Sequence, residues 1–352
     1  MGNIVDMFES NFNMLFKAVR ERNVAKVKTL IQLGGNAISP RGDISLFCVV
    51  VQQGDVNIIK AMAGAKAAVN TPNKDGVTPV FIAALNGYVD VIKALSELKA
   101  DVNIPNLDGV TPVVIAALNA HVDAIKALSM AGANVNTPNK DGATPVYIAA
   151  QGGRAAVIKA LSESGANVNT RNKDGFTPVF IAAMNGHVDA IKVLSMSGAD
   201  VNTPRIDGAT PVLIAAHCGH ADVIKALVSL GADINITHHR GATPVFVAAM
   251  NGHVDTIKAL YTSGANINTP NRCGATPLFM AAQNGHGDVV KVLSILGADI
   301  NTPRKDGITP VIVATQNGHT DTLNILHSLG ADVGVTWPDF CHSDLHHSKA
   351  GS

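Results

Sequence analysis

Apolar residues recur along this chain in two short clusters, and the whole arrangement repeats every 33 residues. In one copy PVYIAAQ, residues 145–151, is followed after a short gap by RAAVIKALSES, residues 154–164, whose apolar positions fall on one helical face. Thr144 suits the position before a helix, and the proline after it suits the first turn, where a missing N–H costs nothing. Gly153 and Gly165 favour the left-handed backbone that ends a helix. Each copy therefore predicts two short helices joined by a tight turn.

A polar segment separates each pair of helices from the next. In the same copy it reads NVNTRNKDG, residues 167–175, and ends in the turn signal Asp174-Gly175. We expect this segment to project from the helices as a finger.

The copies follow one another without insertion, and this regularity defines the organisation of the chain. The Thr-Pro pair begins at Thr78, Thr111, Thr144, Thr177, Thr210, Thr243, Thr276 and Thr309, in steps of 33 (111 − 78, and so on). One further step back places Ser45-Leu46 in register, in a degenerate repeat. We predict an N-terminal segment (1–8), an array (9–335) and a C-terminal tail (336–352). Within the array we expect a cap (9–41), the degenerate repeat (42–74) and eight full repeats (75–335).

Three segments carry a family resemblance: DGATPVYIAA at 141–150, NGH at 185–187 and SGANVNT at 164–170. Together they resemble the ankyrin repeat. The resemblance implies an all-α fold, an ankyrin-repeat α-solenoid of stacked helix-turn-helix repeats with projecting β-hairpin-like fingers. It also implies that first helices line a concave face, that second helices form the convex back, and that the protein binds other proteins through the concave face and the fingers.

Two departures from the family pattern predict local differences. The histidine that usually follows Thr-Pro is replaced by an apolar column, which we expect to pack where hydrogen bonds usually hold the loop: Phe81, Val114, Tyr147, Phe180, Leu213, Phe246, Phe279 and Ile312. Lys66 and Lys99 stand where other repeats have glycine. If the left-handed backbone is kept there, each costs about 1 kcal/mol.

Composition and charge exclude several functional classes. Lys and Arg balance Asp and Glu at 27 each, so no global field favours nucleic acid or an acidic membrane. The four cysteines share no short spacing that would indicate disulfides or a metal site. No apolar run is long enough to span a bilayer or serve as a signal peptide, and Asp6 breaks a myristoylation motif at Gly2. We expect a monomeric cytoplasmic protein, with the nucleus as the alternative location.

Catalytic and metal-binding patterns are weak. His217, Cys218 and His220 lie close together, but His220 belongs to the repeated Gly-His pair, so we expect a structural role and no catalytic residues. The tail carries a cluster without recognised ligand spacing, which leaves metal binding or metal-dependent hydrolysis as alternatives: Cys341, His342, His346 and His347. We expect no metal, no cofactor and no enzyme activity.

Variation among the copies concentrates at two columns, which we predict to bind a protein partner. One follows Ala-Ala on the first helix and is rich in Leu, Met and Gln, and the other lies at the finger tip and is mostly basic. The candidate protein-binding residues are Lys74, Leu85, Leu107, Leu118, Lys140, Gln151, Lys173, Phe176, Met184, Ile206, His217, His239, Met250, Arg272, Gln283, Lys305 and Gln316. The alternative is recent duplication without a tuned site.

Other repeated residues have structural interpretations beside functional ones. In the second helices a lysine column, such as Lys93 after Asp90, indicates paired surface charges, with an anionic partner as the alternative. Finger asparagines such as Asn136 are expected to bond to the backbone, with hydroxylation as the alternative.

In the C-terminal tail, Trp337 and Phe340 are expected to pack over the last repeat. The alternative is a binding tail, which would suit an adaptor or regulatory subunit that recruits a ligase, kinase or phosphatase.

Overall fold

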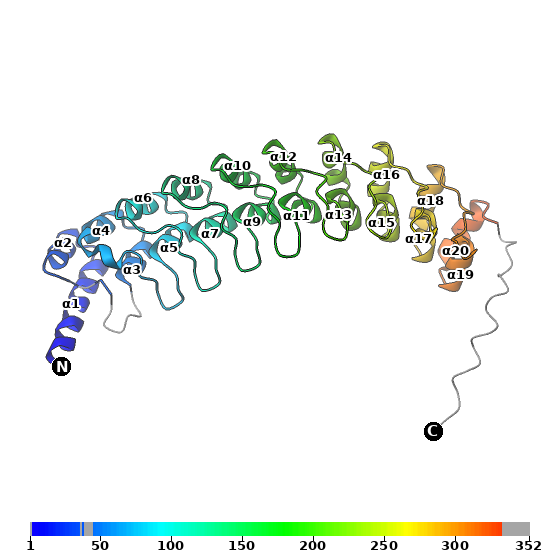
Figure 1. Ribbon diagram of the computed structural model, residues 1–352. Helices are drawn as coiled ribbons and strands as arrows, with labels where there is room; N and C mark the ends of the chain where they lie inside the picture. The colour runs from blue at the N-terminus through cyan, green and yellow to red at the C-terminus, as the bar shows by residue number, and fades with distance from the viewer. Residues whose placement is uncertain (1, 36, 39–44, 333–352) are drawn as a thin grey trace, which may run out of the picture. The chain divides into compact units, whose positions relative to one another are not determined.

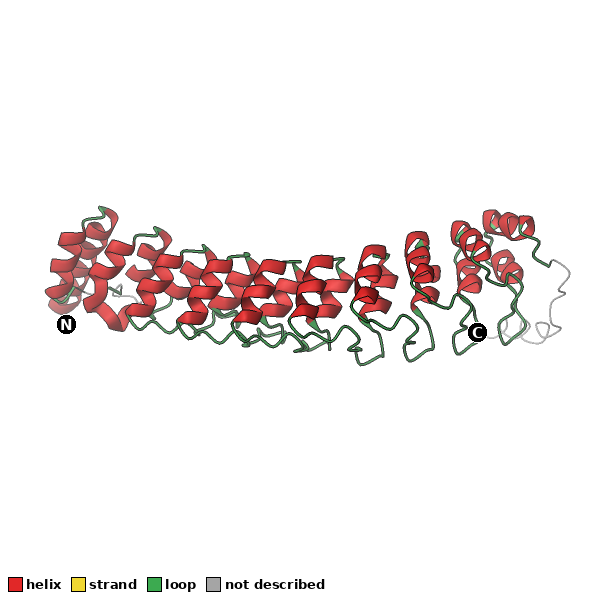
Figure 2. Cartoon of the chain, turned by 90° about the horizontal axis from the view of Figure 1, so that it is seen from above, coloured by secondary structure: helices red, strands yellow, loops and turns green. Residues whose placement is uncertain are grey.

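Helices make up the regular structure of this protein. The computed structural model describes residues 2–35, 37–38 and 45–332, and in these ranges the only β pairing is an isolated bridge between Ile38 and Ser45 (Figures 1 and 2). The chain forms two compact blocks. The N-terminal block is Met1–Ile181 with Val193–Ala199, and the C-terminal block is Ala182–Lys192 with Asp200–Ser352.

The N-terminal block pairs a first and a second helix in each repeat. Its elements are α1 (Gly2–Arg20), α2 (Val24–Gln32), α3 (Leu46–Gln52), α4 (Val56–Ala61), η1 (Met62–Ala68), α5 (Pro79–Leu85), α6 (Val89–Glu97), α7 (Pro112–Leu118), α8 (Val122–Met130), α9 (Pro145–Gln151) and α10 (Ala155–Glu163). First helices α3, α5, α7 and α9 pack in succession, as do second helices α4, α6, α8 and α10 (Figure 1). Helix α1 runs without a break through residues 8 and 9, where we expected the N-terminal segment to meet the cap.

The C-terminal block continues the same pattern. Its complete helices are α13 (Pro211–Cys218), α14 (Ala221–Ser229), α15 (Pro244–Met250), α16 (Val254–Thr262), α17 (Pro277–Gln283), α18 (Gly287–Ile295), α19 (Pro310–Gln316) and α20 (Thr320–Ser328). Helices α11 (Pro178–Met184) and α12 (Val188–Met196) each contain residues of both blocks. First helices α13, α15, α17 and α19 pack in order, as do α14, α16, α18 and α20.

The predicted helix starts are confirmed by the cap geometry. Before α9 the Thr144 backbone is extended, and its hydroxyl accepts a hydrogen bond from the Tyr147 N–H at 3.3 Å. Pro145 occupies the first turn, where its missing N–H leaves no bond unmade. A hydroxyl in this position satisfies one of the otherwise unpaired amides of the first turn.

The core of each repeat lies between its two helices. The alanine pair of α9 is fully buried, and so are Ile158 and Leu161 of α10. Alanine allows two helices to approach closely, and Ile158 and Leu161 supply larger buried side chains from the second helix. The predicted apolar face of the second helix is therefore confirmed.

The two lysines at glycine positions differ from each other. Lys99 adopts φ 63°, the left-handed conformation that glycine has in the matching positions Gly132 and Gly165. Lys66 does not, because its repeat ends in the 3-10 helix η1 (Met62–Ala68) instead of a left-handed turn. The condition for strain is therefore met at Lys99 and not at Lys66, where the degenerate repeat has a different helix ending.

Replacing Lys99 by glycine is expected to stabilise the protein by up to about 1 kcal/mol, since glycine adopts φ 63° without a Cβ penalty. Thermal unfolding followed by circular dichroism measures this as a rise in Tm of a few degrees. Lys66→Gly is the matched control and should give no gain, because a 3-10 helix has no left-handed residue to relieve. A Tm that stays the same or falls in Lys99→Gly would contradict the assignment.

Candidate protein-interaction surface

A column of histidines joins successive repeats on the side where the two helices of each repeat meet. The Nε2–H of His121 donates to the carbonyl of Leu85, at the end of α5 in the preceding repeat, at 3.0 Å. The ring also packs over Gly87, where a Cβ would lie 2.8 Å from its Nδ1. The same contact recurs at His220, His253, His286 and His319, with distances of 2.9–3.0 Å. The repeated histidine therefore has a structural role, as predicted.

A column of asparagines joins successive repeats at the base of the fingers. The Nδ2–H of Asn136 donates to the Gly165 carbonyl at 3.2 Å, and its Oδ1 accepts from the Asn167 N–H at 2.7 Å. Asn202 makes the matching pair of bonds to Gly231 and Asp233, at 3.1 and 2.9 Å. The predicted bonds to backbone are confirmed, and they reach the next repeat as well as the local bend.

The first candidate surface, here called the first-helix row, consists of the residues that end each first helix. In the N-terminal block Leu85 and Leu118 are 40% and 45% exposed, and Gln151 is also exposed. In the C-terminal block the row is more varied: His217 and Gln316 are exposed, whereas Met184, Met250 and Gln283 are half-buried. The asparagine after Leu85 closes the helix end, with its Nδ2–H donating to the Ile82 carbonyl at 2.9 Å. The row therefore presents apolar and amide side chains on rigid helix ends.

The second candidate surface, the finger column, has its side chains exposed at every repeat: Lys74, Leu107, Lys140, Lys173, Ile206, His239, Arg272 and Lys305. Leu107 and Ile206 are 68% and 83% exposed, which is high for apolar residues. At Lys173, His239, Arg272 and Lys305 the backbone of the tip is tied to the preceding finger; the Lys173 N–H, for example, donates to the Asp141 carbonyl at 3.1 Å. The side chains of this column are therefore exposed, and at these four tips the backbone beneath them is hydrogen-bonded to the preceding finger.

Phe176 lies apart from the other finger candidates. It is half-buried at the finger base and stacks on Phe180 of α11, with ring centroids 5.0 Å apart.

The apolar column that replaces the family's histidine packs into the core as expected, with one addition. The hydroxyl of Tyr147 accepts a hydrogen bond from Asn172 Nδ2 at 3.4 Å, so this residue still ties its finger down. Burial, with a smaller effect from Asp174, raises the pKa of Tyr147.

Surface charges on the second helices are largely paired. The ammonium of Lys93 lies 3.6 Å from Asp90, and the same spacing gives pairs at Lys192, Lys225, Lys258 and Lys291. Lys60 instead reaches Glu97 of the following repeat at 3.6 Å. All these groups are more than half exposed, and such pairs add little to stability. They neutralise most of the lysine column, as predicted.

The histidine and cysteine near the end of α13 are not arranged for nucleophilic catalysis. His220 bonds to the Met184 carbonyl, and His217 Nδ1 accepts from Asn251 Nδ2 at 3.1 Å. Burial raises the pKa of Cys218, which disfavours the thiolate that a nucleophile requires. The ring nitrogens are used in contacts between repeats.

Cys48 on α3 is expected to make stability depend on pH in the alkaline range. Burial raises the pKa of this thiol from 9.0 to about 11, and only 4% of the residue is exposed. Below pH 9 the thiol is protonated in both states. Between pH 9 and 11 the unfolded chain ionises while the folded chain does not, so stability falls as pH rises, by about 2–3 kcal/mol over the window.

The measurement is the free energy of unfolding in urea at several pH values, for the natural chain and for Cys48→Ala. Lysines and tyrosines titrate in the same range, so the difference between the two proteins is the readout. The advantage of the natural chain should shrink from pH 9 to pH 11. Parallel curves would show that Cys48 does not titrate differently in the folded state.

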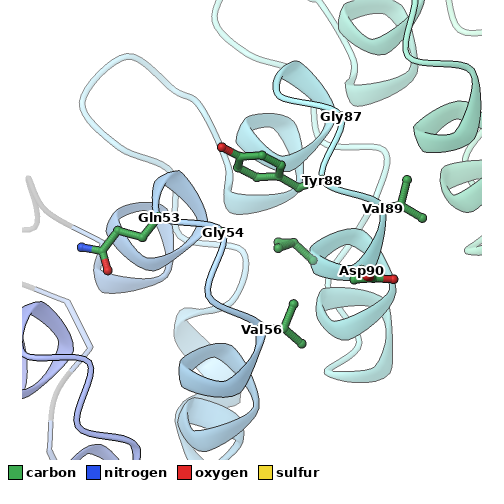
Figure 3. A pocket seen from close by; sticks show the side chains of 8 residues that line it. Gln53, Gly54, Val56, Gly87, Tyr88, Val89 and Asp90 are labelled. Atoms are coloured by element: carbon green, nitrogen blue, oxygen red, sulfur yellow. The ribbon is translucent and has the colours of Figure 1, made fainter.

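The N-terminal block also contains an open surface pocket of about 420 Å³ between two helix turns. Figure 3 shows Tyr88, which takes the place of the column histidine, lying beside the turn at Gly54, with Val56 and Asp90 at the other side. A Cβ at Gly54 would lie 3.6 Å from the tyrosine ring, compared with 2.8 Å for the histidine at Gly87. The larger tyrosine ring is therefore accommodated at a slightly greater separation from the glycine.

Two features of the surface were missed from the sequence. Ala120 adopts φ 59° at a position where the other full repeats have glycine, and the next repeat there has Arg154 instead of histidine or tyrosine. The Arg154 guanidinium lies over Gly152, in the space that an added Cβ would take. The second feature is the replacement of the turn aspartate by Arg240 and Cys273 in two fingers. Reading the columns against one another would have found both.

The described residues hold no cluster of three or more side chains able to bind a metal ion. The histidine-rich segment of the tail and the expected packing of Trp337 and Phe340 lie outside the described residues. None of the helices in the described ranges combines the length and the apolar character that a bilayer crossing requires.

Comparison with protein families gives a match over nearly all of the array. A model described as ankyrin repeats, in three copies, matches residues 46–139, 114–205, 202–271 and 247–336. Comparison with curated proteins found no similar sequence. The family match agrees with the stacked helix pairs, the Thr-Pro caps and the histidine contacts described above. The chain therefore belongs to the ankyrin-repeat family.

Proposed function

We propose that this chain is a non-enzymatic scaffold that binds a protein partner through the first-helix row and the finger column. Ankyrin repeats are generally protein-interaction modules, and the family is typically non-catalytic. The observation that carries the proposal is the exposure of Leu85 and Leu118, 40% and 45%, beside a framework of fully buried alanines. Apolar side chains held in a row on rigid elements favour a protein partner, since they bury without losing much conformational freedom.

The finger column supplies the second half of the surface. Its four lysines and Arg272 stand at the tips, whereas Leu107 and Ile206 interrupt them with exposed apolar groups. A polar rim beside an apolar row is the usual anatomy of an interface between proteins. Backbone hydrogen bonds between neighbouring fingers, as at Lys173, Arg272 and Lys305, limit the movement of these tips within each block, which favours selectivity.

The test is affinity capture from cell lysate with the full chain as bait. The variant is Leu85→Ser with Leu118→Ser. It replaces the two apolar side chains of the first-helix row in the N-terminal block, which are 40% and 45% exposed. The matched control is Met130→Ser with Met196→Ser, at residues 89% and 85% exposed at the ends of α8 and α12. All three proteins should first be shown to melt alike.

A protein captured by the natural chain and the control, but lost from the Leu85/Leu118 variant, supports the proposed surface. Equal loss from the control would indicate nonspecific apolar capture, and equal retention by all three would contradict a role for this row. The adaptor alternative depends on the terminal segments, of which residues 333–352 lie outside the described ranges.

A further inference from the structure

Three consecutive fingers of the C-terminal block carry an excess of positive charge. In the five fingers before them the residue after the finger column is aspartate: Asp75, Asp108, Asp141, Asp174 and Asp207. The next two have Arg240 and Cys273 in that place, and aspartate returns only at Asp306. The cations of these three fingers are Arg240, Arg272, Arg304 and Lys305, and their one carboxylate is Asp306. Their net charge is therefore +3.

The nearby carboxylates are already engaged. Asp306 is held by the guanidinium of Arg304, whose Nε lies 3.0 Å from each carboxylate oxygen and whose Nη2 also bonds to it. This contact lowers the pKa of Asp306. Asp207 lies 3.5 Å from Arg205. Within the described ranges, Arg240, Arg272 and Lys305 form no ion pair.

The backbone that carries these cations is tied from finger to finger. The Lys305 N–H donates to the Cys273 carbonyl at 3.2 Å, and the Arg272 N–H donates to the Arg240 carbonyl at 3.3 Å, so the three fingers are joined in sequence. Their stems pack on glycines of the preceding fingers, with the Cγ atoms of Arg272 and Lys305 3.0 and 2.8 Å from where a Cβ would lie at Gly241 and Gly274. The fingers are therefore joined at the backbone, while the charged ends of Arg240, Arg272 and Lys305 remain exposed to a ligand.

A cleft lies between the last two of these fingers. Arg272, Cys273, Arg304, Lys305 and Asp306 line a volume of about 480 Å³. Arg304 forms its side, with its guanidinium 5.3 Å from the centroid of the Phe279 ring. Because Cys273 takes the place of the repeated aspartate, the cleft lacks the carboxylate that the first five fingers have at this position.

From this arrangement we infer that the three fingers, residues 238–240, 271–273 and 304–306, form a docking site for an extended protein segment rich in Asp and Glu. The inference rests on the proposed function and names the chemistry of the partner at the finger column. Guanidinium groups bind carboxylates through two parallel hydrogen bonds, and spaced cations on successive fingers match spaced carboxylates along one strand.

A protein segment fits this site better than a nucleic acid. Strong phosphate-backbone binding uses about six to ten cationic contacts, and single strands are further held by stacking on exposed aromatic rings. Four cations are present here, and the aromatic ring beside them, Phe279, is fully buried.

The test is fluorescence anisotropy with a labelled Glu-Ser repeat peptide and the full chain at low salt. Cys273→Asp places the aspartate of the other fingers in the cleft and should weaken binding by at least about threefold, while Arg272→Glu should weaken it by about tenfold or more. Cys273→Asn is the neutral control of the same size and should bind like the natural chain. Lys140→Glu makes the same kind of charge change in the N-terminal block, beside Asp141, and should change binding by less than about twofold.

The inference is overturned if Cys273→Asp binds the peptide like the natural chain, if Cys273→Asn weakens it equally, or if Lys140→Glu has as large an effect as Arg272→Glu. Tighter binding of a single-stranded oligonucleotide than of the peptide would also overturn it, in favour of a nucleic-acid site. The two proposals can fail separately. If the peptide test fails but a partner is captured in a way that depends on Leu85 and Leu118, the proposed function stands and only the acidic docking site is lost.

Discussion

Phe279→Ala is expected to lower the free energy of unfolding by about 3–5 kcal/mol, because it removes a large, fully buried side chain and leaves a cavity. Phe279 lies on α17, which packs against α15, α18 and α19, so the loss falls on several interfaces at once. In a repeat protein such interfaces supply most of the stability. The variant should therefore unfold its C-terminal repeats first.

The measurement is urea unfolding followed by circular dichroism, with hydrogen exchange to locate the loosened repeats. Phe279→Leu keeps most of the apolar volume and should cost less than half as much. Ile295→Ala, at a residue 81% exposed, should be nearly neutral and controls for the loss of an apolar residue in itself. An effect of Phe279→Ala no larger than that of Ile295→Ala would mean that the ring is not part of the core.

Gly285→Ala is expected to cost about 2–4 kcal/mol, more than a left-handed alanine alone. Gly285 has φ 75°, which costs alanine about 1 kcal/mol. Its new Cβ would lie 2.7 Å from Nδ1 of His319, so the ring must move away from the Gln283 carbonyl that its Nε2–H now meets at 3.0 Å. Strain, a steric clash and a broken contact between repeats therefore act together.

The matched control is Gly297→Ala, because Gly297 has φ 94° but no atom within 4 Å of its added Cβ. It should show only the conformational cost. Unfolding in urea separates the two variants, and the histidine contact is the difference between them. Equal losses would show that the contact adds nothing beyond the backbone strain.

The protein itself contains a change of this kind at Ala120. There an alanine occupies the left-handed position, and the following repeat has Arg154, whose guanidinium lies over Gly152. The histidine ring is absent where the Cβ is present. This pairing supports steric exclusion as the cause of the cost expected at Gly285.

The repeat pattern of the sequence predicted pairs of short helices, and its resemblance to the ankyrin repeat predicted how these pairs stack. A 33-residue repeat makes neighbours in sequence into neighbours in space, so the order of helices along the chain is also their packing order. Thr144, Pro145 and Gly153 act within a few residues of themselves, and local backbone preference placed the helix starts and turns correctly. The same local reasoning pointed to the left-handed backbone found at Lys99.

The tertiary structure alone decided what depends on a neighbouring repeat. Lys66 lies in a 3-10 helix, although its column predicts a left-handed turn. The partner of His121 is a carbonyl 36 residues away, and Arg304 lies on Phe279, in a cleft beside Cys273. Solvent exposure also varies within the first-helix row, since the side chain of Leu118 is exposed while that of Met250 is half-buried. A repeat pattern specifies the type of residue at each position. Side-chain contacts and burial depend on the particular residues of the adjoining repeats, and comparing one position across the repeats does not show these.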